Sequence, residues 1–139
     1  MSVSEKGLRA IDTNILVRLF TSDDAKQFEA VKSLVRKSEE RNEILFVSIL
    51  VLVEMIWVLS RQYCMSRSVL VDRLDQLMAS PIFQIERELL VAHAVDQYRR
   101  GPADFADYLI GAVAEDAGCR DTVTFDRKLR EAPGFTILE

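Results

Sequence analysis

The feature that most constrains the fold is a short, largely apolar run that ends in a carboxylate and continues into a helix. Residues 8–11 form the run, Asp12 follows directly, and apolar side chains resume at helical spacing over residues 15–20. This pattern indicates a buried strand that delivers an acid at its carboxyl end and then turns into a helix. In open parallel sheets, ligands bind just beyond the carboxyl ends of the strands. We therefore interpret Asp12 as the first wall of an active site.

Strands and helices alternate along the rest of the chain. Apolar periodicity, caps and breakers predict helices over residues 23–40, 49–59, 66–79, 86–100 and 104–117, a helical turn over 126–130, and strands over 43–47, 82–85, 121–125 and 135–138. This alternation predicts an α/β protein with a central, mostly parallel sheet of four to five strands flanked by helices. With no repeat and no linker, residues 1–139 are expected to form a single domain.

Composition narrows the function classes. The 139 residues are 49% hydrophobic and 29% charged, and this length and hydrophobic fraction suffice for a hydrophobic core. The net charge of -4 is not that of a protein that coats nucleic-acid duplexes. The two cysteines lie far apart, which favours free thiols in a reducing compartment. The first residues do not resemble a signal peptide, and the longest apolar segment, 44–59, is interrupted by Ser48 and Glu54. We expect a cytoplasmic protein with no membrane span.

Glu54 is the sharpest anomaly, because the other ten residues of the segment 49–59 are apolar. A helix of this kind is expected in a core, where an unpaired carboxylate costs several kcal/mol. Glu54 must then be protonated, paired with a cation, or bound to a metal. A buried salt bridge to an arginine is the structural alternative. Its place early in a helix that follows a strand favours the functional interpretation.

Three more acids mark the ends of predicted elements. Asp104 and Asp107 share one helix face, and Asp126 follows the strand that contains Thr124. Helix capping explains Asp104 well and is the alternative for Asp126, whereas capping does not require an acid at Asp107. Four or five carboxylates on one rim, with no histidine partner, have the composition of a site for a hard cation such as Mg²⁺ or Mn²⁺. Such a site activates water and stabilises in-line phosphoryl transfer.

Four stretches resemble the motifs of PIN-domain ribonucleases: residues 11–16, the lone Glu54, residues 104–110 and residues 123–126. The resemblance covers nearly the whole chain in order, and size and sequence style are most similar to VapC-type toxins of bacterial type II toxin–antitoxin systems. It implies a Mg²⁺- or Mn²⁺-dependent endoribonuclease with a small VapB-like antitoxin partner and a homodimeric state. By residue, it implies three core acids (Asp12, Glu54, Asp107), a fourth, more variable acid (Asp126), an additional acid (Asp104) and a hydroxyl (Thr124). Asn14 falls within the first motif as a supporting residue.

Other features are weaker. Arg99, Arg100, Arg127 and Lys128 are candidates for RNA phosphate contacts, and solvated helix ends are the alternative. Trp57, Met55 and Leu70 are candidates for the dimer surface. His93 is the only histidine, so a catalytic triad has no support. Competing functions are a non-catalytic PIN-like RNA- or protein-binding module and another metal-dependent phosphohydrolase or flap-type DNA nuclease.

Overall fold

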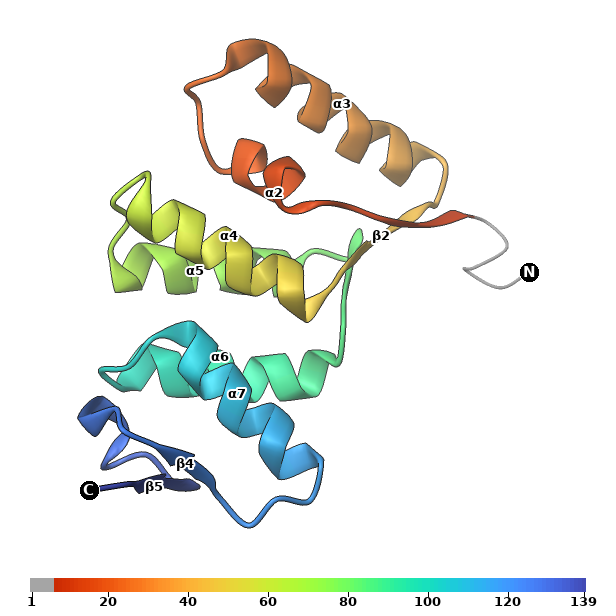
Figure 1. Ribbon diagram of the computed structural model, residues 1–139. Helices are drawn as coiled ribbons and strands as arrows, with labels where there is room; N and C mark the ends of the chain where they lie inside the picture. Colours follow the sequence, from red (N-terminus) through yellow and green to blue (C-terminus); the bar gives the residue numbers. More distant parts are fainter. Residues whose placement is uncertain (1–6) are drawn as a thin grey trace. The chain divides into compact units, whose positions relative to one another are not determined.

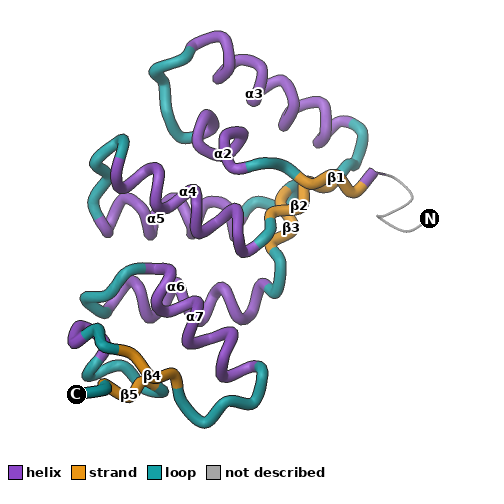
Figure 2. Tube along the Cα trace, viewed as in Figure 1, coloured by secondary structure: helices purple, strands orange, loops and turns teal. Residues whose placement is uncertain are grey.

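The computed structural model describes residues 7–139, which divide into two compact units, one ending at Glu86 and the other running from Arg87 to Glu139 (Figure 1). Within these residues, six α-helices and five short strands form an α/β protein whose strand pairings are all parallel. The predicted class is confirmed. The strands divide between a three-stranded sheet in the first unit and a two-stranded sheet in the second (Figure 2). Over residues 7–139, no helix has both the length and the apolar character that a membrane span requires.

The sheet of the first unit has the order β1-β2-β3, formed by β1 (Leu8–Ala10), β2 (Ile44–Val47) and β3 (Phe83–Ile85). Ala10 pairs with Phe46, and the ladder continues beyond the strands, since the Ile11 amide donates to the Phe46 carbonyl at 3.1 Å. The three strands therefore end at one edge of the sheet. Asp12, Ser48 and Glu86 follow the strands at that edge.

Helices α2 (Thr13–Leu19), α3 (Ala25–Glu40), α4 (Ile49–Arg61) and α5 (Arg67–Ala79) complete the first unit. Each begins at a polar N-cap whose side-chain oxygen accepts a backbone N–H; these caps are Asp12, Asp24, Ser48 and Ser66. The core is aliphatic, and its fully buried side chains include Leu16, Leu45, Leu52, Met55, Leu59 and Leu74. Local caps and the apolar pattern thus agree on where the helices begin, as the sequence predicted.

The second unit packs α6 (Glu88–Arg100) against α7 (Phe105–Asp116), followed by β4 (Thr122–Thr124), the 3₁₀ turn η1 (Arg127–Leu129) and β5 (Phe135–Ile137). The turn between the helices is tight. The Ala103 amide donates to the hydroxyl of Tyr108 at 3.2 Å, and a Cβ on Gly101 would lie 1.9 Å from that hydroxyl. Glycine at 101 lets this buried tyrosine fix the segment that leads into Asp104.

Ser48→Ala should lower the free energy of unfolding by about 1 kcal/mol, because the Ser48 Oγ accepts from the Val51 amide at 3.1 Å at the start of α4. Urea denaturation measures the change. Ser60→Ala, at an exposed position near the end of the same helix, is the matched control and should be near neutral. Equal effects of the two substitutions would contradict the capping role.

Two carboxylate clusters at the candidate active site

The first unit joins Asp12 to Glu54 through Thr13. Asp12 lies at the N-cap of α2, where its Oδ1 accepts from the Thr13 amide at 2.7 Å. The buried hydroxyl of Thr13 donates a short hydrogen bond to Oε1 of Glu54, forty-one residues away. One residue, Thr13, therefore orients both carboxylates. Thr13 is not among the site residues predicted from the sequence.

The premise that Glu54 is buried is wrong, because its side chain is exposed to solvent. The face of α4 that carries Glu54 also carries Leu50 and Trp57, which are 82% and 57% exposed, whereas Leu52, Met55, Ile56 and Leu59 fill the core from the other side. Because the sequence of α4 is apolar on all sides, it does not predict which face is exposed to solvent. The partner that holds the Glu54 carboxylate is the Thr13 hydroxyl.

Two hollows open beside this pair, of about 420 and 600 Å³, and both are lined by Asp12, Thr13 and Glu54. The other residues that line the smaller hollow are Asn14, Val17, Arg18, Val58, Gln62 and Tyr63, and those of the larger one are Ser48, Leu50, Val51, Val53 and Trp57. Of these residues, only Asn14 is predicted at the site from the sequence, and Arg18 and Gln62 belong to none of the predicted motifs.

A network of hydrogen bonds fixes the side chain of Arg18, which lines the smaller hollow. Arg18 donates to Oδ1 of Asp23 at 3.1 Å and to the Tyr63 hydroxyl at 2.9 Å, and Tyr63 donates to the other oxygen of Asp23 at 2.8 Å. The Tyr63 hydrogen bond and the Arg18 charge hold the pKa of the Asp23 carboxyl below its usual range. This network ties the end of α2 to the segment that follows α4.

A third acid lies at the same sheet edge in the first unit. Oε1 of Glu86 accepts from the Ile49 amide at 2.8 Å, so this carboxylate satisfies a backbone donor at the start of α4. From the sequence, Glu86 is predicted only as the start of the next helix. It acts as a structural cap between segments 37 residues apart.

The second unit brings together Asp104, Asp107 and Asp126. Oδ2 of Asp107 accepts from the Asp104 amide at 3.1 Å at the start of α7. Asp107 therefore does contribute to capping, which the sequence analysis had assigned to Asp104. Asp126 accepts from the Lys128 amide at 3.0 Å, and its own amide donates to the Thr124 hydroxyl at 3.0 Å, so Thr124 fixes the turn that presents this acid.

Burial raises the pKa of the Asp107 carboxyl above its ordinary value, and the neighbouring charges of Asp104 and Asp126 raise it further. The hydrogen bond from the Asp104 amide and the positive charge of Lys128 act in the opposite direction. Asp104 and Asp126 thus repel the ionised Asp107 carboxylate, and a cation beside Asp107 would relieve this repulsion.

The candidate cation-binding groups fall into separate sets. Asp12 and Glu54 belong to the first unit, and Asp104, Asp107 and Asp126 belong to the second. Among residues 7–139, no three His, Cys, Asp or Glu side chains form a group that could hold a metal ion. The donor sets are nevertheless all oxygen and contain no histidine or cysteine, which suits Mg²⁺ or Mn²⁺ in preference to zinc.

The remaining predicted residues are placed as follows. Met55 and Leu70 are 0% and 2% exposed, so their prediction as dimer-surface residues is wrong, since both fill the core of the first unit. Trp57 keeps an exposed side chain. The four basic candidates, Arg99, Arg100, Arg127 and Lys128, are all exposed in the second unit, and Arg100 forms an ion pair with Asp96.

The family model of the PIN domain matches residues 10–134, so the chain belongs to the PIN domain family, as the resemblance implied. The chain is also similar to a VapC ribonuclease of Aquifex aeolicus (strain VF5). The two are 22% identical over 131 residues, which cover 94% of this chain and 96% of that protein.

Asp107→Asn should stabilise the metal-free protein at pH 7. The pKa of Asp107 is higher in the folded state than in the unfolded state, so protonation of Asp107 adds to the free energy of unfolding. This contribution is fully present below the unfolded-state pKa of about 3.9. It is lost as the pH rises through the raised pKa of the folded state. Asparagine keeps an oxygen that accepts from the Asp104 amide. The rise in Tm relative to wild type should shrink as pH falls towards 3.5.

Melting curves in chelator over pH 3.5–7.5 measure this effect. Asp72→Asn, at an exposed position in α5, is the matched control and should shift Tm little at any pH. A gain for Asp107→Asn that does not vary with pH would contradict the electrostatic explanation.

Proposed function

We propose that the protein is a Mg²⁺- or Mn²⁺-dependent endoribonuclease that acts as the toxin of a toxin–antitoxin pair. The observation that carries the proposal is the match to the PIN family model over residues 10–134, a span in which Asp12, Asp107 and Asp126 lie at the start of helical segments and Glu54 is held by the Thr13 hydroxyl. Similarity to a VapC ribonuclease over 94% of the chain supports both the RNA substrate and the toxin role.

The proposed cation ligands are Asp12 and Glu54 in the first unit, supported by Asn14, and Asp107 and Asp126 in the second unit, supported by Asp104 and Thr124. When bound, a divalent ion lowers the pKa of a coordinated water and stabilises charge on the phosphate. The protein's own contribution is orientation: Thr13 positions Asp12 and Glu54, and Thr124 positions Asp126. A family model that matches residues in both units also supports the proposal that residues 1–139 work as one domain.

The proposal extends to partners. Arg99, Arg100, Arg127 and Lys128 would contact RNA phosphates, a VapB-like antitoxin would restrain the enzyme, and the site of action would be the cytoplasm. A homodimer would bury the exposed apolar face of α4, with Leu50 and Trp57 in place of Met55 and Leu70. A non-catalytic PIN-like module is the second candidate, and wild-type RNA cleavage decides between the two.

Asp12→Asn and Asp107→Asn should each abolish cleavage of a structured RNA in Mg²⁺ while keeping the fold. Asparagine caps a helix as well as aspartate does, but its neutral amide is a much weaker partner for a hard cation. Asp104→Asn should keep partial activity, because its capping position tolerates the amide. Gel assays with RNA, DNA and a phosphomonoester, beside circular dichroism, provide the measurement.

Near wild-type RNA cleavage by Asp107→Asn would remove the central residue of the proposed site. Preferred hydrolysis of DNA or of the phosphomonoester by the wild type would instead assign the fold to another phosphohydrolase activity.

Thr13→Val should lower cleavage by about tenfold and raise the Mg²⁺ concentration needed for half-maximal activity, because the donor that orients Glu54 is lost. Thr13→Ser retains the hydroxyl and should rescue both quantities. If valine and serine behave alike, Thr13 acts only in packing.

A further inference from the structure

Two adjacent hollows in the second unit share a wall made by His93, Gln97 and Pro133. The first hollow, of about 360 Å³, lies between α6, α7 and the start of β5, and the second, of about 430 Å³, is bounded by Arg100 and Lys128. Both volumes fall in the usual range for small-molecule sites. We call the two together the α6 groove.

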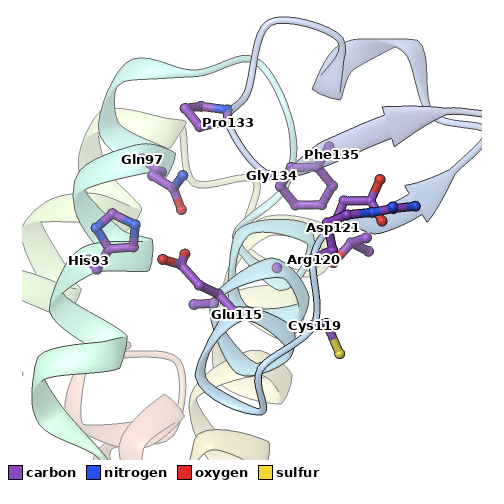
Figure 3. A pocket seen from close by; sticks show the side chains of 12 residues that line it. His93, Gln97, Glu115, Cys119, Arg120, Asp121, Pro133, Gly134 and Phe135 are labelled. Carbon is purple, nitrogen blue, oxygen red and sulfur yellow. The ribbon is translucent and has the colours of Figure 1, made fainter.

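The first hollow combines an aromatic wall with hydrogen-bonding groups. Figure 3 shows the carboxylate of Glu115 and the amide of Gln97 pointing toward one another, with the ring of Phe135 on the far side. The ring can pack against α7 because residue 111 is glycine, since a Cβ there would lie 2.5 Å from Cζ of Phe135. Aromatic contact plus edge-on hydrogen bonds is how proteins hold an unpaired RNA base.

The polar groups favour one base. An ionised carboxylate only accepts hydrogen bonds, so a ligand at Glu115 must bring donors. Guanine presents two adjacent donors, N1–H and the N2 amino group, that match the two oxygens of a carboxylate, and its O6 can accept from the Gln97 amide. Uracil has one such donor between two carbonyls and would place an acceptor against Glu115.

The second hollow links this pocket to the acids. Lys128 lines the second hollow, and its backbone amide donates to Oδ1 of Asp126 at 3.0 Å, so one residue borders both the hollow and the acids. Arg100 lies on the same hollow, and its ion pair with Asp96 is exposed on both sides, at 70% and 51%, so exchanging that partner for a phosphate costs little.

We propose that the α6 groove binds the RNA nucleotide next to the cleaved phosphate, with a guanine base against Glu115 and Gln97 and a phosphate against Lys128 and Arg100. This rests on the proposed function and assigns a base preference to it. The aromatic wall of Phe135 suits a base, the groups of Glu115 and Gln97 suit its hydrogen-bonding edge, and Arg100 and Lys128 suit a phosphate, although Glu131 also lines the second hollow. This combination fits a nucleotide better than the apolar segment of a protein partner.

The first test uses the metal-free protein and free nucleotides. His93 is the only histidine, so its ring NMR signals report on the groove without ambiguity. GMP should shift them and bind about tenfold or more tightly than UMP. Glu115→Gln should remove this preference, because an amide cannot accept from both guanine donors. Glu88→Gln, at an exposed position in the first turn of α6, is the matched control.

The second test uses RNA cleavage. Glu115→Gln should raise KM about tenfold for a guanosine-containing RNA with kcat unchanged, as expected for a binding contact away from the reacting atoms. Replacing guanosine by inosine, which lacks the N2 amino group, should raise KM for the wild type and not for Glu115→Gln. Glu88→Gln should match the wild type on both substrates.

The outcomes separate the two proposals. RNA cleavage with unchanged KM in Glu115→Gln and no His93 response to GMP would overturn the guanine site and leave the ribonuclease proposal intact, with a protein partner as the groove's occupant. Absence of cleavage by the wild type would defeat the proposed function. The GMP titration would then decide the guanine pocket alone, and a silent His93 would overturn it.

Discussion

Parallel pairing of β1, β2 and β3 is the constraint on which the first unit's site depends. The ladder continues past the strands, since Ile11 bonds to Phe46 at one junction and Glu86 bonds to Val47 at the other. The chain therefore leaves all three strands at one edge, and α2 and α4 both begin there. A one-residue slip of β1 would turn its side chains to the opposite face and carry the Asp12 carboxylate away from α4. The bond between Thr13 and Glu54 is thus a consequence of sheet register.

The sequence predicted the features that depend on neighbouring residues. Asp12, Ser48 and Ser66 mark helix starts because their side chains bond to amides one to three residues ahead, and such signals are readable in a local window. The exposure of Glu54 was not readable in this way. It depends on which side of α4 is covered by elements that are distant in sequence. When a helix is apolar on all sides, its own sequence does not show which side is exposed to solvent.

Long-range partners account for the other omissions. The Thr13 hydroxyl donates to Glu54 across 41 residues, and Glu86 accepts from the Ile49 amide across 37 residues. Neither hydrogen bond has a spacing that a sequence pattern could reveal. For Asp107 the local spacing is readable, but it does not decide the role of the residue. Its interval from Asp104 correctly predicted a shared helix face, yet the same interval serves capping and cation binding equally well. Spacing alone cannot divide the two roles, because one carboxylate has oxygens enough for both.

Charge distribution links the acids to the proposed substrate. A protein with a net charge of -4 repels a polyanion at long range, so RNA binding has to rely on local cations. In the second unit the cations border the acids, and Lys128 partly offsets the negative charge around Asp107. The offset is incomplete, since burial and the neighbouring carboxylates still raise the pKa of Asp107. Helix capping alone would not require Asp104 and Asp126 to act on Asp107 in this way, and the repulsion they cause at Asp107 is what the proposed cation site would relieve.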